Sequence, residues 1–471
     1  MLNNIEITNT ICYNRHKFKL YVFYIDKYLE ADMLETNDRK MFERILNQEL
    51  VYATGCTEPA AVSYCASIAA KELKDLGDTV EKIDVLASKN ILKNAMSAGL
   101  PKTTHVGVNY AAGIGALHGN PANKLNVNND IDDETYVKVE KMIADNKISV
   151  GVSKEPNVLY IEITITGKQH KAQVVIADSH TDVVLIKVDD EVKFKGESTV
   201  KDDTKITHNE IYQFLSLEKI YNFCTSKEYD PINDPIEMIN KAVEVNTVIS
   251  KAGLETTYGL GIGRRLENNI KRGRRANNVE NRAIMKTTAG ADARMAGAPY
   301  PVVANSGSGN QGITITIPVL SVAEDMKVSE DVKLRAVTLA HLCSIFIKSR
   351  FGTLSAFCGA AVASTGAACG MTYLHGGDEK AIERTINNMF GIVTGMVCDG
   401  AKPDCSLKIY SGLRAAFEST YLSIDQVRVQ GNEGVVCEDA ADTISNICDM
   451  SKTCSSVLDD KILYYMLNKK K

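Results

Sequence analysis

The sequence contains no tryptophan, and aromatic residues make up only 6% of its 471 positions. It has no run of about 18 apolar residues, so no membrane-spanning helix is predicted. Its net charge is only −5, so neither nucleic acid nor a membrane is an expected partner. The apolar run at 18–25 is short and flanked by charges, unlike a secretory signal. These absences favour a cytoplasmic globular protein, and they are compatible with a homo-oligomer.

The length predicts two or three domains. Residues 1–40 fit poorly with the remainder and are interpreted as an N-terminal extension, with Met33 as a candidate initiator. Residues 41–205 combine helical segments with alternating apolar segments typical of strands. The expected strands lie near residues 83–87, 148–152, 159–165, 174–176 and 184–186. Because the connections near Gly167 and Ser179 are short, we expect antiparallel neighbours.

Residues 206–471 carry apolar stripes at helical spacing, for example at 382–397 and 407–421. The segment 311–320 fits either a strand or the start of a buried helix. The predicted fold class is α+β, with an N-terminal α+β domain that contains an antiparallel sheet. An all-helical domain is expected to follow it.

Three of the twelve cysteines, Cys358, Cys398 and Cys405, form the most informative pattern. We expect Cys398 to end one helix, Cys405 to begin the next, and Cys358 to lie on a third helix at 355–371. Three thiolates without a nearby fourth suit an iron–sulfur cluster with one open iron, which can bind a substrate. The spacing is not that of ferredoxins, so three unlinked thiols are an equal alternative.

A fourth cysteine lies in the segment Gly55-Cys56-Thr57-Glu58-Pro59, at the start of an expected helix. Thr57 is expected to cap this helix, and Pro59 fits its first turn. A helix N-terminus should lower the pKa of the Cys56 thiol. Cys56 is therefore a candidate base, nucleophile or exchangeable cluster ligand, whereas a plain cysteine in a capping loop is the more common outcome.

Residues 305–312 form a polar, glycine-rich segment ahead of an apolar run, and its amides and hydroxyls suit a carboxylate or phosphate. Just upstream, Asp292 and Arg294 could pair with each other or hold a substrate carboxylate. A surface ion pair is the more common outcome for such residues. His180 follows an expected strand, where a lone histidine more often has a structural role.

Several motifs together resemble the cysteine desulfidase family, the single-chain relatives of iron–sulfur L-serine dehydratases. They are Gly-Cys56-Thr-Glu-Pro, Thr-Ala-Gly-Ala-Asp292-Ala-Arg294-Met, Asn305-Ser-Gly-Ser-Gly-Asn-Gln-Gly-Ile, Cys398-Asp-Gly-Ala and Gly431-Asn-Glu-Gly434. They follow the family order across about residues 41–460, and residues 1–40 have no counterpart.

The resemblance implies an oxygen-sensitive 4Fe–4S cluster held by Cys358, Cys398 and Cys405, with Cys56 nearby as base or mobile ligand. It further implies a set of residues that meet an amino-acid substrate. These are Thr57, Glu58, His180, Asn305, Ser306, Ser308 and Asn310.

The activity that the resemblance implies is a lyase that needs no pyridoxal phosphate and converts L-cysteine to pyruvate, ammonia and hydrogen sulfide. Two alternatives stay open at this point. One is L-serine dehydration, because thiol and hydroxyl leave from the same carbon. The other is a non-catalytic iron–sulfur or thiol sensor, which would keep the three cysteines but need no substrate loop.

Overall fold

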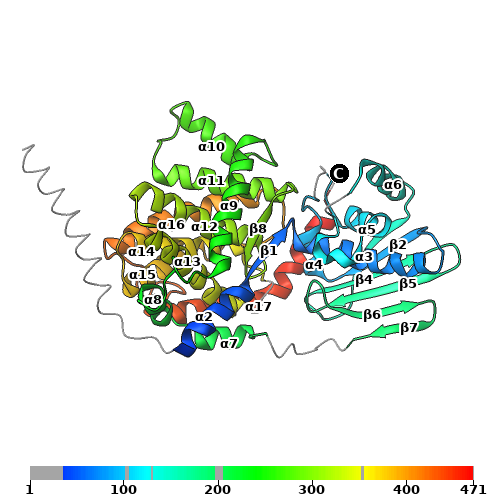
Figure 1. Ribbon diagram of the computed structural model, residues 1–471, viewed down its shortest axis with the longest axis horizontal. Coiled ribbons are helices and arrows are strands. Elements are labelled where there is room, and N and C mark those ends of the chain that lie inside the picture. Colours follow the sequence, from blue (N-terminus) through cyan, green and yellow to red (C-terminus); the bar gives the residue numbers. More distant parts are fainter. Residues whose placement is uncertain (1–35, 101–104, 129–130, 197–204, 352–354, 470–471) are drawn as a thin grey trace, which may run out of the picture.

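The computed structural model describes residues 36–100, 105–128, 131–196, 205–351 and 355–469. The described chain forms a helical region and a sheet-containing region that lie side by side (Figure 1). Of the expected N-terminal extension, residues 1–35 lie outside the described residues, and Met33 is among them.

The sheet region is built around a six-stranded sheet with the order β3-β2-β4-β5-β6-β7. Its strands are β2 (Lys82–Ala87), β3 (Ile148–Val152), β4 (Tyr160–Thr166), β5 (Lys171–Ala177), β6 (Val183–Val188) and β7 (Glu191–Lys195). Strands β2 and β3 are parallel, and every other neighbouring pair is antiparallel. The expected antiparallel sheet is therefore confirmed, with β7 as a strand that the sequence analysis did not anticipate.

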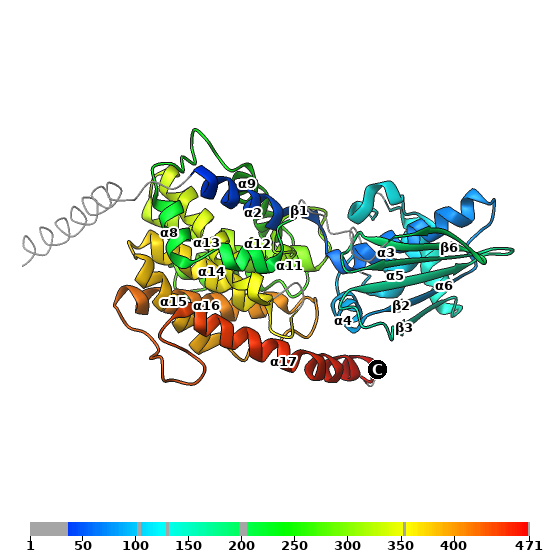
Figure 2. The ribbon, with the colours of Figure 1, turned by 90° about the horizontal axis from the view of Figure 1, so that it is seen from below.

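Apolar and polar or exposed residues alternate along the strands, so one face of the sheet is buried and the other is not. In β2, Ile83, Val85 and Ala87 are buried, whereas Leu86 between them is exposed. Helices α3 and α5 cover the buried face (Figure 2). The helical elements of this region are α3 (Thr57–Asp75), α4 (Lys89–Ala95), α5 (Val108–Leu117), the 3₁₀ helix η1 (Pro121–Asn126) and α6 (Asp133–Ala144).

The helical region has a separate hydrophobic core centred on α12, α13 and α14, whose side chains are almost all buried. Its first helices are α7 (His208–Phe214), α8 (Leu217–Thr225), α9 (Glu237–Glu255), α10 (Ile262–Lys271) and α11 (Val279–Met295). Its later helices are α12 (Gly309–Met326), α13 (Glu330–Phe351), α14 (Gly359–Leu374), α15 (Glu379–Val393) and α16 (Cys405–Ile424). The ambiguous segment 311–320 is therefore helical, and Pro318 lies inside α12.

A helix and a short strand lead the chain from the helical region into the sheet region. Helix α2 (Thr36–Glu49) places Phe42 and Ile45 in the core of the helical region. Strand β1 (Leu50–Thr54) then pairs antiparallel with β8 (Pro301–Asn305) before the chain enters the sheet region. Neither β1 nor β8 was expected from the sequence pattern. The division at residues 40 and 205 stays a proposal.

Helix α17 (Ala440–Leu467) runs from one region to the other (Figure 2). Its first half buries Ile444 and Ile447 in the helical core, whereas Leu463 packs in the core of the sheet region. Near that end, Asp459 forms a buried ion pair with Lys93 of α4. No helix in the described ranges is long and apolar enough to cross a membrane.

Candidate active site

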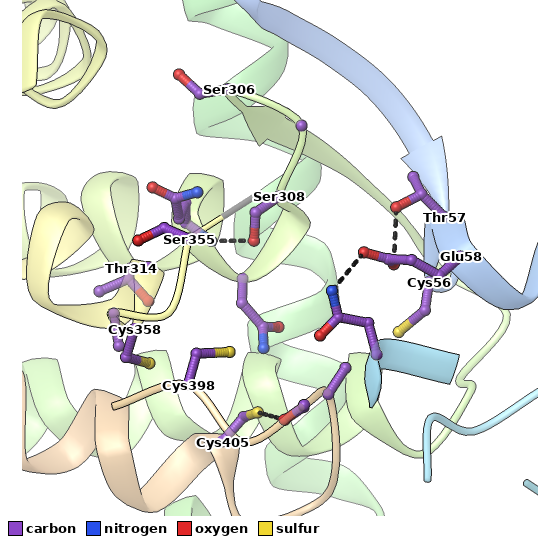
Figure 3. Close-up of a pocket in the computed structure, with 18 of the residues that line it drawn as sticks. Cys56, Thr57, Glu58, Ser306, Ser308, Thr314, Ser355, Cys358, Cys398 and Cys405 are labelled. Carbon is purple, nitrogen blue, oxygen red and sulfur yellow. Dashed lines mark hydrogen bonds between the residues drawn. The ribbon is translucent and has the colours of Figure 1, made fainter. Parts of the chain in front are cut away.

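One pocket collects most of the residues that the sequence analysis singled out (Figure 3). Its volume of about 220 Å³ suits a small molecule rather than a polymer. Its expected lining residues are Cys56, Thr57, Glu58, His180, Ser306, Ser308, Asn310, Cys358, Cys398 and Cys405. Of the expected site residues, only Asn305 is absent from this lining.

A short backbone bridge holds Cys358 and Cys398 side by side. The Cys358 N–H donates to the Met396 carbonyl (2.8 Å), and the Cys398 N–H donates to the Ala356 carbonyl (2.8 Å). Helix α14 begins at Gly359, so Cys358 precedes the helix instead of lying on one at 355–371. Helix α15 ends at Val393, so Cys398 does not end a helix either. Both expectations were wrong because the bridge, a tertiary contact, sets these boundaries.

Cys405 is the first residue of α16, as expected, and its thiol donates to the Gly400 carbonyl (3.7 Å). Gly400 has a φ of +98°, and an added Cβ would lie 2.1 Å from the Lys93 carbonyl oxygen of α4. Only glycine fits both this conformation and this close approach. The loop 398–405 therefore packs directly against the sheet region.

The three thiols of this group differ in how readily they ionise. The Cys358 thiol donates to Cys398, which raises the pKa of Cys358 and lowers that of Cys398 to about 6. Positive charge on Lys93 acts on Cys398 in the same direction. Burial raises the pKa of Cys405 to about 11. Cys398 is thus the thiol most readily ionised, which suits it to bind a metal.

Cys56 faces these thiols from the other side of the pocket, where the chain turns from β1 into α3 (Figure 3). Gly55 has a φ of +73°, and Cys56 is the N-cap residue of α3. Thr57 is already helical, so it is not the cap that we expected. Burial raises the pKa of Cys56, and the opposing charge of Arg294 is the smaller effect. The expected lowering was wrong because the thiol is buried.

The first turn of α3 also directs polar groups to the pocket. The Thr57 hydroxyl donates to Glu58 Oε2 (3.0 Å), and Asn94 Nδ2 of α4 donates to Glu58 Oε1 (3.3 Å). His180, in the turn after β5, lines the same pocket, and its buried Nε2 has no hydrogen-bond partner among the described residues. The sheet region thus supplies one thiol, one carboxylate and several hydrogen-bonding groups.

The serine loop, residues 306–308, joins β8 to α12. Ser306 and Gly307 have φ values of +46° and +79°, and Ser308 caps α12 by accepting from the Gln311 N–H (3.4 Å). Asn305 lies behind the loop, where its side chain accepts from the Ser306 hydroxyl and contacts His341 Nδ1 (3.0 Å). Asn305 therefore contacts the loop and lies outside the pocket lining.

The pocket contains further polar residues that the sequence analysis did not select, among them Asn94, Gln311, Thr314 and Lys348. Gln311 Oε1 and Thr314 Oγ1 are buried without a hydrogen-bond partner in the described part of the chain. Burial lowers the pKa of Lys348 to about 8. The available signal for Lys348 was a lysine directly after the mostly apolar segment 342–347, whereas Asn94 has no such signal.

Arg294 and Asp292 do not form the surface ion pair that was the more common expectation. Both are buried, and the Arg294 guanidinium donates to the Gly55 carbonyl (3.0 Å) and to Asn310 Oδ1 (3.3 Å). Asp292 turns away to accept from the Gly263 N–H at the start of α10 (3.1 Å). Burial raises the pKa of Asp292 to about 6.

A single metal ion has no ready site here. Across the described ranges, no three His, Cys, Asp or Glu side chains are grouped as one ion requires. In a 4Fe–4S cluster each thiolate binds a different iron, so the sulfurs need not converge on one point. Three cysteines around one pocket, one of them with a lowered pKa, are the donor type that such clusters use. The residues therefore fit the group that the resemblance implies.

Comparison with known proteins identifies the family. The model of the serine dehydratase alpha chain family matches residues 65–464. The chain belongs to this family. The alpha-chain match covers both regions of the structure and includes Cys358, Cys398 and Cys405, whereas Cys56 lies upstream of the matched residues.

Similar proteins of full length are known from several bacteria, each named only "UPF0597 protein". The relative from Clostridium perfringens strain ATCC 13124 is 37% identical over 434 residues, which is 92% of this chain and 99% of that protein. The relative from Chromobacterium violaceum is 37% identical, over 91% of this chain and 97% of its own. The relative from Porphyromonas gingivalis is 36% identical, over 93% of this chain and 100% of its own length. These names state no activity.

Proposed function

We propose that this chain is an iron–sulfur lyase that converts L-cysteine to pyruvate, ammonia and hydrogen sulfide without pyridoxal phosphate. The observation that carries the proposal is that Cys358, Cys398 and Cys405 share one pocket with a separate thiol, Cys56. Membership of the serine dehydratase alpha chain family supports the same class of reaction. A reducing cytoplasm would keep these thiols free.

Cys358, Cys398 and Cys405 would hold a 4Fe–4S cluster, which supplies a Lewis acid for the leaving group on the β-carbon. The residues of the chain then have to bind the amino acid and move one proton. We propose that the thiolate of Cys56, which lies across the pocket from the other thiols, takes the proton from the α-carbon.

The reaction balances without an added oxidant or reductant. Loss of the α-proton and of the β-thiol from L-cysteine gives 2-aminoacrylate and hydrogen sulfide. The enamine then tautomerises to an imine, and water converts this to pyruvate and ammonia. We propose that Thr57, Glu58, His180 and the serine loop contact the amino acid, and that Asn305 keeps this loop in place.

L-serine dehydration is the second candidate, and the description of the matching family favours it. The same proton transfer applies, with water as the product in place of hydrogen sulfide. A non-catalytic sensor is a weaker candidate, because it gives no role to the polar groups that line the pocket without partners, such as Gln311 Oε1 and Thr314 Oγ1.

The test is to purify the protein without oxygen, reconstitute it with iron and sulfide, and measure pyruvate and sulfide from L-cysteine, with L-serine in parallel. The proposal requires equal amounts of sulfide and pyruvate, in a reaction that depends on iron. Faster turnover of L-serine would reassign the substrate. A brown but inactive protein would favour sensing, and a colourless protein would refute the ligand assignment.

A further inference from the structure

Arg294 is a buried positive charge that forms no ion pair with an Asp or Glu side chain of the described residues. Its side chain lines the pocket, and the residue is 6% exposed. Its hydrogen bonds go to neutral atoms, namely the Gly55 carbonyl, Asn310 Oδ1 and Met295 Sδ. The Nε is buried and has no partner in the described ranges. A buried charge is costly unless it is paired, so this site is suited to an anion from outside the chain.

The surroundings of Arg294 favour the same kind of ligand. The guanidinium lies against Gly309, the first residue of α12, where an added Cβ would be 2.3 Å from Arg294 Nε. A helix of this length has positive partial charge at its N-terminus, which attracts anions. Arg294 and the start of α12 therefore act together at this end of the pocket.

Glu58 gives the pocket a charge of opposite sign. It is the only acidic side chain among the described residues that line the pocket. Its hydrogen bonds come from the neutral side chains of Thr57 and Asn94, so no cation neutralises it through these contacts. Arg294 reaches the residue before Cys56, and Glu58 is the second residue after it. The two charges thus flank the proposed base.

Lys348 is the other positively charged residue that lines the pocket, but its ammonium group lies near the cysteines proposed to bind the cluster. Cys398 and Cys358 are among the charges that act on its ammonium group, and Glu58 is not. Lys348 can therefore balance the negative charge of these thiolates. Arg294 remains as the cation that can meet a substrate beside Cys56.

We propose that Arg294 binds the carboxylate and Glu58 the ammonium group of a free α-amino acid, so that together they select zwitterions with Cys56 between them. The inference rests on the proposed function, since it places the substrate of the same site. It excludes amides and simple carboxylates as good ligands, because each lacks one of the two charges. It also excludes peptides, because their two terminal charges are not on the same α-carbon.

The test uses ligands that cannot react and that lack one charge at a time. L-alanine carries both charges and no leaving group, L-alaninamide lacks the carboxylate, and propionate lacks the ammonium group. Their dissociation constants are measured by calorimetry on the anaerobically reconstituted wild-type protein and on R294Q and E58Q. R282Q is the control, because Arg282 lies on the same helix but pairs with Asp325 at the surface.

The wild-type protein and R282Q should bind L-alanine at least about 10-fold more tightly than either analogue. Loss of one charged hydrogen bond should weaken L-alanine binding by about 10–100-fold in each pocket variant. In R294Q the preference for L-alanine over L-alaninamide should disappear, whereas the preference over propionate remains. E58Q should show the reverse pattern.

A purely structural role for either residue would weaken all three ligands to the same extent, and that outcome would overturn the proposal. So would a wild-type protein that does not bind L-alanine. The binding assay needs no turnover, so it separates the two proposals. Selective binding by an inactive protein would refute only the lyase, and active protein with unselective binding would refute only the assignment of Arg294 and Glu58.

Discussion

The two regions of the molecule contribute different chemistry to one pocket. The helical region supplies the three clustered cysteines, the serine loop and both long cations, whereas the sheet region supplies Cys56, Glu58 and His180. A cluster could bind to the helical region alone, but the proposed proton transfer needs the sheet region at a fixed distance. The difference suggests that cofactor binding and turnover can be separated by mutation.

The largest effect is expected from the helical side. Replacing Cys398 with serine removes the most readily ionised of the three thiols, so the variant should lose the brown colour and at least about 10³-fold in turnover. Absorbance and sulfide release after reconstitution measure both. C454S is the matched control, because Cys454 is exposed on α17. Colour and activity that survive in C398S would refute the ligand role.

The sheet side should behave differently. Cys56→Ala should keep the cluster absorbance, because Cys56 lies outside the group of three, and should lose about 10²–10⁴-fold in turnover through loss of the base. The absorbance spectrum and the rate of pyruvate formation test the two halves of this prediction. If the variant lost its colour as well, Cys56 would be a ligand. Full turnover would remove it from the mechanism.

A third variant breaks the link between the regions. Lys93 and Asp459 are 2% and 9% exposed in their side chains, and D459N would leave Lys93 charged and buried without its partner. We expect a loss of about 3–5 kcal/mol in the free energy of unfolding, measured with urea.

The neighbouring pair provides the control for that experiment. Lys89 and Asp460 make the same kind of contact between α4 and α17, but both are about half exposed, so D460N should cost at most about 1 kcal/mol. The double variant K93M/D459L should recover most of the stability. Equal losses in D459N and D460N would show that burial of the first pair contributes nothing.

The smallest effect is expected inside the helical region, at the buried carboxyl group of Asp292. Its pKa is about 6 in the folded protein and about 4 when unperturbed, so its contribution to stability is present below pH 4 and is lost as the pH rises through 6. Asparagine cannot ionise.

The unfolding free energy of D292N should therefore improve relative to wild type by about 1–3 kcal/mol between pH 4 and pH 8. Urea unfolding at several pH values measures this change. If the difference in unfolding free energy between D292N and wild type did not vary with pH, the pKa of Asp292 would not be raised by burial.

Local pattern was sufficient to predict much of the fold. One-sided burial makes strands such as β2 alternate in polarity, and this period is visible in the sequence. Strand β1 escaped prediction because its residues are partly exposed and its partner β8 lies far away in the chain. The start of α14 was misplaced for a related reason, since pairing of Phe357 with Val397 fixes it.

The site was predictable where residue type carries the chemistry and not where packing does. Cysteines and a glycine-rich polar loop are recognisable in a sequence. Residue type alone does not mark Asn94 and Lys348 as functional, because only the folded structure places them in the pocket lining. The raised pKa of Cys56 could not be predicted, because its burial depends on residues of the other region.

The ladder between β1 and β8 has a consequence for the order in which the molecule can assemble. It joins Thr54 to Pro301 and Leu50 to Asn305, which are about 250 positions apart. Contacts between residues so far apart in the chain form late, because closing the long loop costs entropy before the contacts can stabilise it. During synthesis from the N-terminus, the sheet region can fold while β8 is still unmade. Cys56 therefore reaches its final place only after most of the chain has left the ribosome, so the pocket is completed near the end of folding.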